Sequence, residues 1–480
     1  MSKERLFSLV DEKQDQYIHT ADTIWGYAET RFEEKKSAAA LCDLLRKEDF
    51  TVEENVSKIP YAFVGTWGSG KPVLGFLGEF DALSGLSQKQ DVAVREAIIP
   101  GGNGHGCGHQ LLGSAALAAA VALRDYIKEN KLSATIKYFG CPGEESGSGK
   151  AFMAREGVFS GVDAAITWHP GSETMVTTGS SLANIQVYFK FIGRASHAGG
   201  SPHLGRSALD AVELMNVGVN YLREHVISEA RMHYAVVNTG GKSPNVVQPE
   251  AEVLYLIRAP KNNLVKDIYE RVCDIARGAA LMTSTKLTIQ IDKACSNLIP
   301  NETLENVMLE NLNLIPRREP SAAELDFAAE IQTTLSEEEK KSSYNGLIAI
   351  FGEKEGRKVA AELLKQPITD AIVPYKTSEK AMSGSTDVSD VSWITPTVQC
   401  NTSCTALNTP GHSWQLVAQG KNHWAHTGML EAAKAMAGVG LDLILQPDKL
   451  AAAKQELAER LSDGPYVCPI PAGIQPSPVK

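Results

Sequence analysis

Three apolar segments alternate with helical patterns in the first third of the chain. They read PVLGFLGEFDAL (72–83), ATIKYFGC (134–141) and VDAAITWH (162–169), and each has the length of a single strand. Strands that are apolar along their whole length are buried on both faces, and the helices between them provide the crossovers of a parallel sheet. The sequence therefore predicts an α/β fold with a mostly parallel sheet.

The hydrophobic period changes after residue 182. LANIQVYFKFIGRASH (182–197) alternates apolar and polar residues, as a half-exposed strand does. Patterns for a helix, two strands, a helix and a strand follow, which is the ferredoxin-like order. We therefore expect an α+β domain at 183–296, inserted into a larger domain formed by 1–182 and 297–480, with a helical insertion around 297–380. We also expect the first strand of the inserted domain to be a sheet edge that pairs with another subunit.

Length and composition exclude several classes of protein. A chain of 480 residues is too long for one hydrophobic core. The net charge of -10 argues against a nucleic-acid binder, and the longest apolar run (111–123) is too short to span a bilayer. The N-terminus has no signal-peptide core, and the eight scattered cysteines are typical of reduced thiols. These features predict a cytoplasmic protein without nucleic-acid or membrane partners.

Four separated stretches carry most of the potential metal ligands. They are GHGCGH (104–109), GCPGEESGSG (140–149), TWHPG (167–171) and NTPGHSW (408–414). Three of them lie at or just after predicted strand ends, where an open α/β sheet forms its ligand crevice. Any one of these stretches would more often have a structural role than a metal-binding one. Their joint placement at strand ends indicates one shared site. Together they offer Cys107, His109, Glu144, Glu145, His169 and His412.

This mixture of thiol, imidazole and carboxylate suits two divalent ions that share one ligand. Cys107 could bridge them as a thiolate, because the ions would displace its proton. Glu144 and Glu145 are neighbours in a segment that we expect to be extended, so their side chains should point to opposite sides. One carboxylate can then bind metal while the other remains a free base.

The inserted domain has polar candidates of its own. His197 lies in a glycine-lined loop after the first strand, Asn245 lies in KSPNVVQ, and Arg258 ends the strand LYLIRAP. A buried Arg is rare unless it is paired, and it suits bidentate capture of a carboxylate. An ion pair between Arg258 and an internal Asp or Glu is an equal alternative.

At these residues the sequence resembles the M20 metallopeptidase family, in the amidohydrolase branch that cleaves aminoacylated and aminobenzoylated amino acids. The resemblance covers nearly the whole chain. Its most specific segments are GNGHGCGH (102–109), YFGCPGEE (138–145), TWHP (167–170), SPHLGRSALDAV (201–212), SPNVVQ (243–248), LYLIRAP (254–260), STDVSDVSW (385–393) and CPIP (468–471). The resemblance implies a catalytic domain, an inserted dimerisation domain and a two-metal site.

Carried over by position, the resemblance also implies a role for each residue. The metal ligands would be Cys107 (bridging), His109, Glu145, His169 and His412. Glu144 would be the general base, His197 would reach the active site of a partner subunit, and Asn245 and Arg258 would hold the substrate's carboxylate. Many M20 peptidases have His-x-Asp where this chain has Glu79 and Asp81. This departure leaves the metal open: family precedent favours Mn²⁺, while thiolate and imidazole ligands also suit Zn²⁺.

The reaction that the resemblance implies is hydrolysis of the amide bond of p-aminobenzoyl-glutamate, a folate catabolite, to p-aminobenzoate and glutamate. The alternatives are a broader N-acyl amino acid aminoacylase or carboxypeptidase, and a non-catalytic protein that binds acyl amino acids. The expected partners are a small acyl-glutamate substrate and either a second copy of the chain or a related A subunit, bound through the inserted domain.

Overall fold

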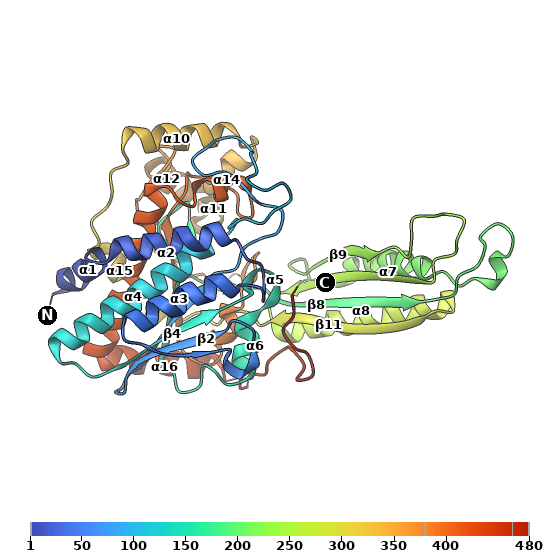
Figure 1. The fold of residues 1–480 in the computed structure, drawn as a ribbon, viewed down its shortest axis with the longest axis horizontal. Helices are drawn as coiled ribbons and strands as arrows, with labels where there is room; N and C mark the ends of the chain where they lie inside the picture. The colour runs from blue at the N-terminus through green and yellow to red at the C-terminus, as the bar shows by residue number, and fades with distance from the viewer. Residues whose placement is uncertain (1, 379–380, 463, 479–480) are drawn as a thin grey trace.

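The computed structural model describes residues 2–378, 381–462 and 464–478. Figure 1 shows a large body built around a central sheet and an arm that projects from one side of it. Residues 183–295 form the arm, and the chain returns to the body after them.

The central sheet has seven strands in the order β1-β2-β4-β3-β5-β13-β6. The four middle strands (β4, β3, β5 and β13) are parallel, whereas β1, β2 and β6 pair antiparallel at the margins. This confirms the predicted α/β fold with a parallel central sheet. Because the middle strands are parallel neighbours, their carboxyl ends meet at one edge. The strands are β1 (Thr51–Glu54), β2 (Phe63–Gly68), β3 (Val73–Glu79), β4 (Thr135–Cys141), β5 (Ala164–Gly171), β6 (Met175–Val176) and β13 (Thr397–Ser403).

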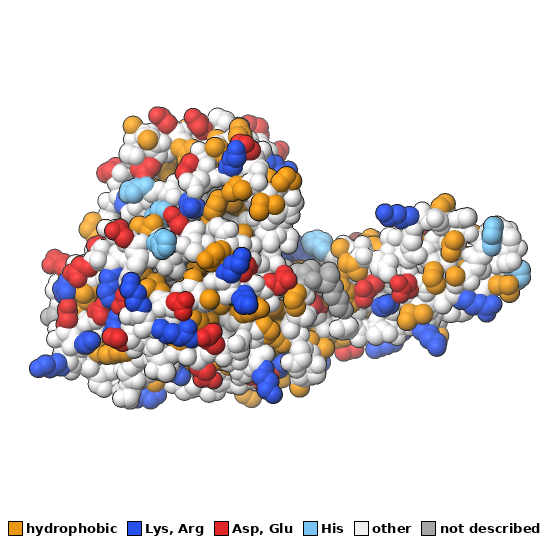
Figure 2. Space-filling view, viewed as in Figure 1, with side chains coloured by type: hydrophobic (Ala, Val, Ile, Leu, Met, Phe, Trp, Pro, Cys, Tyr) orange, Lys and Arg blue, Asp and Glu red, His pale blue; other side chains and the backbone are white. Residues whose placement is uncertain are grey.

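The arm is a four-stranded antiparallel sheet in the order β11-β8-β10-β9, with α7 and α8 packed on one face. This is the ferredoxin-like arrangement that the sequence predicts. In Figure 2 hydrophobic side chains are scattered over the visible surface of the arm. The elements are β8 (Ala183–Ile192), α7 (Ala208–Leu222), β9 (Arg231–Asn238), β10 (Glu250–Ala259), α8 (Asn262–Thr283) and β11 (Lys286–Cys295).

The prediction that β8 is an edge strand is wrong. β8 is hydrogen-bonded to β10 on one side and to β11 on the other, so the edges of this sheet are β9 and β11. The alternating pattern of β8 reflects that helices pack on only one face of the sheet, so Gln186 and Lys190 on the other face are only partly buried. It carries no information about how many neighbours the strand has.

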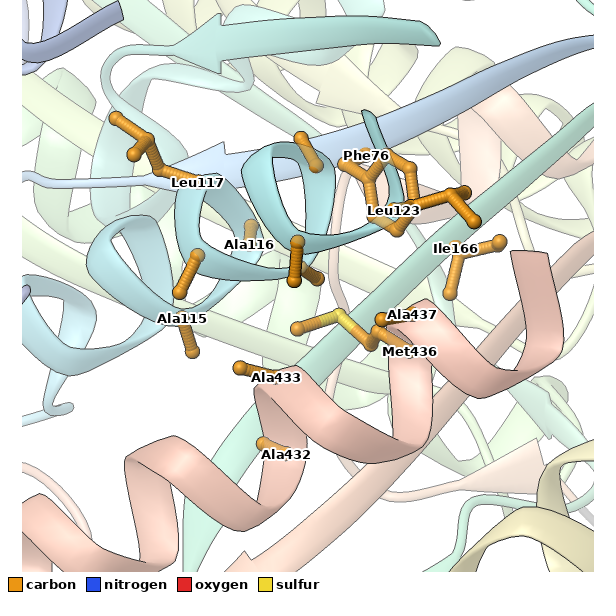
Figure 3. Packing of buried hydrophobic residues seen from close by; sticks show 14 of the residues in the cluster. Phe76, Ala115, Ala116, Leu117, Leu123, Ile166, Ala432, Ala433, Met436 and Ala437 are labelled. Atoms are coloured by element: carbon orange, nitrogen blue, oxygen red, sulfur yellow. The ribbon is translucent and has the colours of Figure 1, made fainter. Parts of the chain in front are cut away.

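Helices cover both faces of the central sheet. α4 (His109–Asn130) and α15 (His423–Leu445) pack together on one face, and α6 (Gly149–Arg155) and α13 (Val388–Ser392) lie on the other. Figure 3 shows alanines of α4 and α15 at their contact, with Phe76 and Ile166 of the sheet nearby. Such small side chains allow the two helices to approach closely, which fixes the N-terminus of α4 against the sheet edge.

The remaining helices surround this framework. α1 and α2 pack on α4, and α9 packs on α15 and β13, so α9 belongs to the main core. α10, α11 and α12 form smaller clusters beyond it. No helix in the described part of the chain is long and apolar enough to cross a membrane. The bounds are α1 (Lys3–Asp11), α2 (Gln14–Tyr27), α3 (Lys35–Lys47), α9 (Glu302–Leu314), α10 (Ala322–Thr333), α11 (Ser342–Phe351), α12 (Glu353–Leu363), α14 (Trp414–Gln419) and α16 (Pro447–Arg460).

Candidate metal centre

The predicted ligand residues gather at the carboxyl edge of the central sheet. His169 lies near the end of β5, and Glu145 lies in α5 (Glu144–Gly147), which follows β4. His412 lies in the loop after β13. Cys107 and His109 lie where the loop after β3 enters α4. Four connections of the sheet therefore converge on one place.

The side chains form two groups that share one sulfur. The ligand atoms of Cys107, His109 and His169 all lie within 4.8 Å of one another, and so do those of Cys107, Glu145 and His412. Two ions bridged by a thiolate need this arrangement, with one ligand common to both groups. All five predicted ligand residues are thus brought together.

Hydrogen bonds aim the histidines of the first group into the cluster. His109 Nδ1 donates to Asp81 Oδ1 at 2.8 Å, and His169 Nδ1 donates to the carbonyl of Pro170 at 2.8 Å. Each ring therefore keeps its Nε2 for the cluster, and His169 Nε2 lies 3.2 Å from Cys107 Sγ. In the second group His412 Nε2 lies 3.2 Å from Glu145 Oε2. Such partners behind a histidine fix the nitrogen that binds a metal.

The glycines of GHGCGH serve close packing. Gly108 has φ +78°, and a Cβ on it would lie 2.6 Å from Pro170 Cγ. The neighbouring Gly106 accepts a hydrogen bond at 2.8 Å from the backbone N–H of His412, which itself has φ 56°. The loops that carry Cys107 and His412 are therefore joined through their backbones.

The third ligand-type side chain of GHGCGH points elsewhere. His105 is buried, and its Nε2 donates to the carbonyl of Ile24 in α2 at 3.1 Å. Burial lowers the pKa of His105 to about 3, with the charge of His109 acting in the same direction. His105 therefore anchors the loop as a neutral side chain and is not part of the cluster.

The electrostatics of the cluster fit bound cations. Burial, together with the charge of Glu145, raises the pKa of the Cys107 thiol well above its usual range. A divalent ion reverses this effect, because it stabilises the thiolate directly. Among the described residues, His109 Nε2 and Glu145 Oε1 are buried without a hydrogen-bond partner. A buried polar atom without a partner lowers the stability of the fold unless something binds it. Both atoms are of the kind that coordinates divalent cations.

Glu144 and Glu145 lie in a single helical turn, so the expectation of an extended segment is wrong. Gly143 (φ +67°) and Ser148 (φ 53°) adopt left-handed conformations that begin and end this turn. Successive helical side chains diverge by about 100°, so the two carboxylates still reach different partners. Glu145 groups with Cys107 and His412, whereas Glu144 groups with Glu79 and His109. Burial raises the pKa of Glu144 well above its usual range, and the charges of Glu79 and Asp387 add to this rise.

A buried ion cluster that the sequence did not predict lies behind the site. Lys150 is completely buried, with its Nζ 2.7 Å from Glu79 Oε1 and also paired with Asp387. Glu79 Oε2 is 3.3 Å from His109 Nε2, although this contact lacks hydrogen-bond geometry. Lys150 therefore fixes a carboxylate beside the centre and joins β3 to the segment before α13.

Replacing Lys150 with Met should lower the free energy of unfolding by about 3–5 kcal/mol, because Glu79 and Asp387 would stay buried without a counter-ion. The matched control is Lys358→Met, which removes an exposed ion pair with Glu355 and should cost less than about 1 kcal/mol. Urea unfolding of the three proteins measures both effects. Equal costs would contradict a structural role for Lys150.

His197 and Asn245, the first two candidates in the arm, do not join the metal-ligand cluster of their own chain. Asn245 is exposed, and so is His197, whose Nδ1 accepts hydrogen bonds from the backbone N–H groups of Gly199 and Gly200 at 3.2 and 2.9 Å. Neither residue belongs to a ligand group among the described residues.

Arg258 is half-buried, and within the described residues it has no ion pair. The alternative prediction, an ion pair with an internal Asp or Glu, is therefore wrong. Its Nε is a buried donor without a partner. The hydrogen bond to Glu145 raises the pKa of His412, and the positive charge of Arg258 opposes this rise. Arg258 therefore lies within electrostatic range of the centre.

Known proteins resemble this chain in sequence and in fold. Residues 75–396 match the model of peptidase family M20/M25/M40. The chain is 49% identical to the B subunit of p-aminobenzoyl-glutamate hydrolase from Escherichia coli over 98% of both chains. It is 29% identical to the A subunit of the same hydrolase, over 46% of this chain and 52% of that one. The crystal structure of Bacillus subtilis YXEP, described as a dinuclear metal-binding peptidase of the M20 family, has a TM-score of 0.54 with 14% identity, covering 91% of this chain and 99% of that one. The match to the family model, the near full-length relative and the shared fold agree, and the chain belongs to peptidase family M20/M25/M40.

Proposed function

We propose that this chain hydrolyses the amide bond of p-aminobenzoyl-glutamate to give p-aminobenzoate and glutamate. The observation that carries the proposal is the pair of ligand groups sharing Cys107, with the further carboxylate Glu144 beside them. The 49% identity to the B subunit of a p-aminobenzoyl-glutamate hydrolase supports the choice of substrate.

Two divalent ions fit the centre. The family resemblance favours Mn²⁺, and the thiolate and imidazole ligands also suit Zn²⁺. Cys107, His109 and His169 would hold one ion, and Cys107, Glu145 and His412 the other. When bound, the ions acidify a water molecule and polarise the amide carbonyl.

Glu144 acts as the general base and then as the general acid. Its carboxylate takes a proton from the attacking water, whose oxygen forms the new bond to the carbonyl carbon. When the C–N bond breaks, Glu144 returns this proton to the leaving amine of glutamate. Burial raises the pKa of Glu144, and a raised pKa makes its carboxylate a stronger base toward the attacking water.

His197 acts in the site of a partner subunit. Because its Nδ1 accepts two backbone hydrogen bonds, its proton is on Nε2, which can donate to the oxyanion formed on the substrate. Its exposure on the arm supports this role, since a residue that completes another subunit's site must be accessible in a single chain.

The arm supplies the surface for that partner. We propose that 183–296 is a dimerisation domain and that 1–182 and 297–480 form the catalytic domain. The helical insertion expected around 297–380 then comprises α10, α11 and α12, because α9 belongs to the main core. The edge strand β9 exposes Tyr234, Val236 and Val237, and an open edge with apolar side chains suits pairing with another chain. That chain is a second copy or a related A subunit, and the similarity to the A subunit of the Escherichia coli hydrolase supports the second choice.

Asn245 and Arg258 bind the carboxylate end of the substrate. Replacing Arg258 with Met should raise KM for p-aminobenzoyl-glutamate about 10- to 100-fold and leave KM for an uncharged p-aminobenzoyl amide nearly unchanged. The matched control is Arg231→Met on the adjacent strand β9, since Arg231 pairs with Arg258 in register but bonds to the carbonyls of Ser228 and Ala230. Steady-state kinetics on both substrates measure the effect. A loss shared equally by the two substrates would count against carboxylate recognition.

A substrate panel tests the reaction itself. With excess Mn²⁺, release of glutamate from p-aminobenzoyl-glutamate should exceed release from aliphatic acyl-glutamates, and p-aminobenzoyl-aspartate should be cleaved more slowly. A preference for aliphatic acyl groups would favour an aminoacylase. Binding of all substrates without any product would favour a non-catalytic protein.

A further inference from the structure

The helix that carries Glu144 and Glu145 depends on its surroundings. α5 has only four residues, and a single helical turn is not stable by itself. Residues 31–34, between α2 and α3, contact α5 at several points. Glu34 Oε1 accepts a hydrogen bond from the backbone N–H of Gly143 at 2.7 Å. Phe32 packs so closely that a Cβ on Gly147 would lie 2.7 Å from its ring. The guanidinium of Arg31 donates to the carbonyl of Ser146.

The same guanidinium also holds the arm. Arg31 forms a bidentate ion pair with Asp292 of β11, with Nη1–Oδ2 and Nη2–Oδ1 both at 3.0 Å. Only 5% of the Arg31 side chain and 6% of the Asp292 side chain are exposed. Asp292 also accepts a hydrogen bond at 2.7 Å from Gln186 of β8. This ion pair therefore lies at the base of the arm, where α5 meets β11 in Figure 1.

Arg31 makes a third contact, with the C-terminal segment of the chain. Arg31 Nε donates to the carbonyl of Ser477 at 3.0 Å, and this segment runs past the base of the arm in Figure 1. The donors of one planar group are thus divided among the α5 helix, the arm and the C-terminal segment. A lysine has no rigid fork and could not satisfy these partners together.

We propose that Arg31 is a positioning residue that couples the orientation of the arm to the placement of Glu144 and Glu145. When the arm rotates, Asp292 moves, and the guanidinium must follow because separation would leave a buried charge unpaired. Movement of the guanidinium shifts the carbonyl of Ser146, which directly follows the two glutamates. The proposal rests on the proposed function, in which the arm delivers His197 to a partner subunit. Seating of the arm on its partner would then align the carboxylates of its own chain.

The test compares two single variants, their double variant and a control, each in the full chain in its assembled, metal-loaded form. Asp292→Asn and Arg31→Lys each break the bidentate pair, and we expect both to lower kcat about 10- to 100-fold while KM and metal content stay near normal. The double variant should be no slower than the slower single variant, because both changes break one link. The matched control is Arg124→Met. Arg124 is a buried arginine of α4 paired with Glu48, so its loss should reduce stability and leave kcat near that of the wild type.

Hydrogen–deuterium exchange gives a readout that does not require turnover. Residues 143–149 should exchange faster in Asp292→Asn than in Arg124→Met, although the first substitution lies in the arm. If this difference appears in a protein that hydrolyses no acyl-glutamate, the coupling stands and the proposed function fails. The coupling is overturned if exchange of 143–149 is unchanged in Asp292→Asn. It is also overturned if exchange rises but kcat stays equal to that of an active wild type.

Discussion

Replacing Glu144 with Gln should lower kcat about 10²- to 10⁴-fold while the protein keeps both ions. The amide is nearly the same size as the carboxylate but cannot accept the proton of the attacking water. Glu145→Gln should instead lose metal, because Glu145 lies with Cys107 and His412 in one ligand group. Steady-state kinetics and elemental analysis of the same preparations separate the two effects.

The matched control is Glu156→Gln, which changes an exposed glutamate beyond the end of α6 and should alter neither quantity. If Glu144→Gln loses metal and Glu145→Gln retains it, the roles of the two glutamates are reversed. We expect metal loss in Glu145→Gln because Glu145, unlike Glu144, shares a ligand group with Cys107, the proposed bridging residue.

Replacing His197 with Ala should lower kcat about 10²- to 10³-fold, the usual cost of losing one donor to an oxyanion. If the partner is a second copy, mixing this variant with Glu144→Gln should restore activity. A mixed dimer has one site with an intact Glu144 from one chain and an intact His197 from the other. With random pairing, about a quarter of the wild-type activity should return, because half of the dimers are mixed and each has one complete site.

The control for this experiment is His203→Ala, which removes another exposed histidine of the same loop and should keep full activity. Dissociation and reassociation of the two inactive proteins, followed by a kinetic assay, measures the rescue. Mixtures that remain inactive, although mixed dimers are shown to form, would contradict a site shared between copies of this chain.

The sequence predicted the place of the site because local patterns determine it. Apolar strands imply parallel neighbours, and parallel neighbours bring their carboxyl ends together, so His169 and His412 could be expected close to Glu145. The helical turn at Glu144 was not predicted, because it depends on left-handed conformations at Gly143 and Ser148. A single short segment contains too little periodicity to reveal such a turn.

The long-range ion pairs were missed for a different reason. Lys150 and Asp387 are 237 residues apart, and Arg31 and Asp292 are 261 residues apart. Neither pair produces a periodic pattern, since each member alone resembles an ordinary surface charge. The central position of β8 in the arm sheet could not be predicted from the residues of β8 alone. The packing of the whole sheet determines which strands become neighbours.

The most direct test of the two-ion centre is anomalous X-ray diffraction from crystals of protein prepared without oxygen and loaded with Mn²⁺. We expect two anomalous peaks about 3.5–4 Å apart. The sulfur of Cys107 should lie between them, with His109 and His169 at one peak and Glu145 and His412 at the other. A single peak, or two peaks with Cys107 outside the bonding distance of either, would contradict a thiolate-bridged pair of ions.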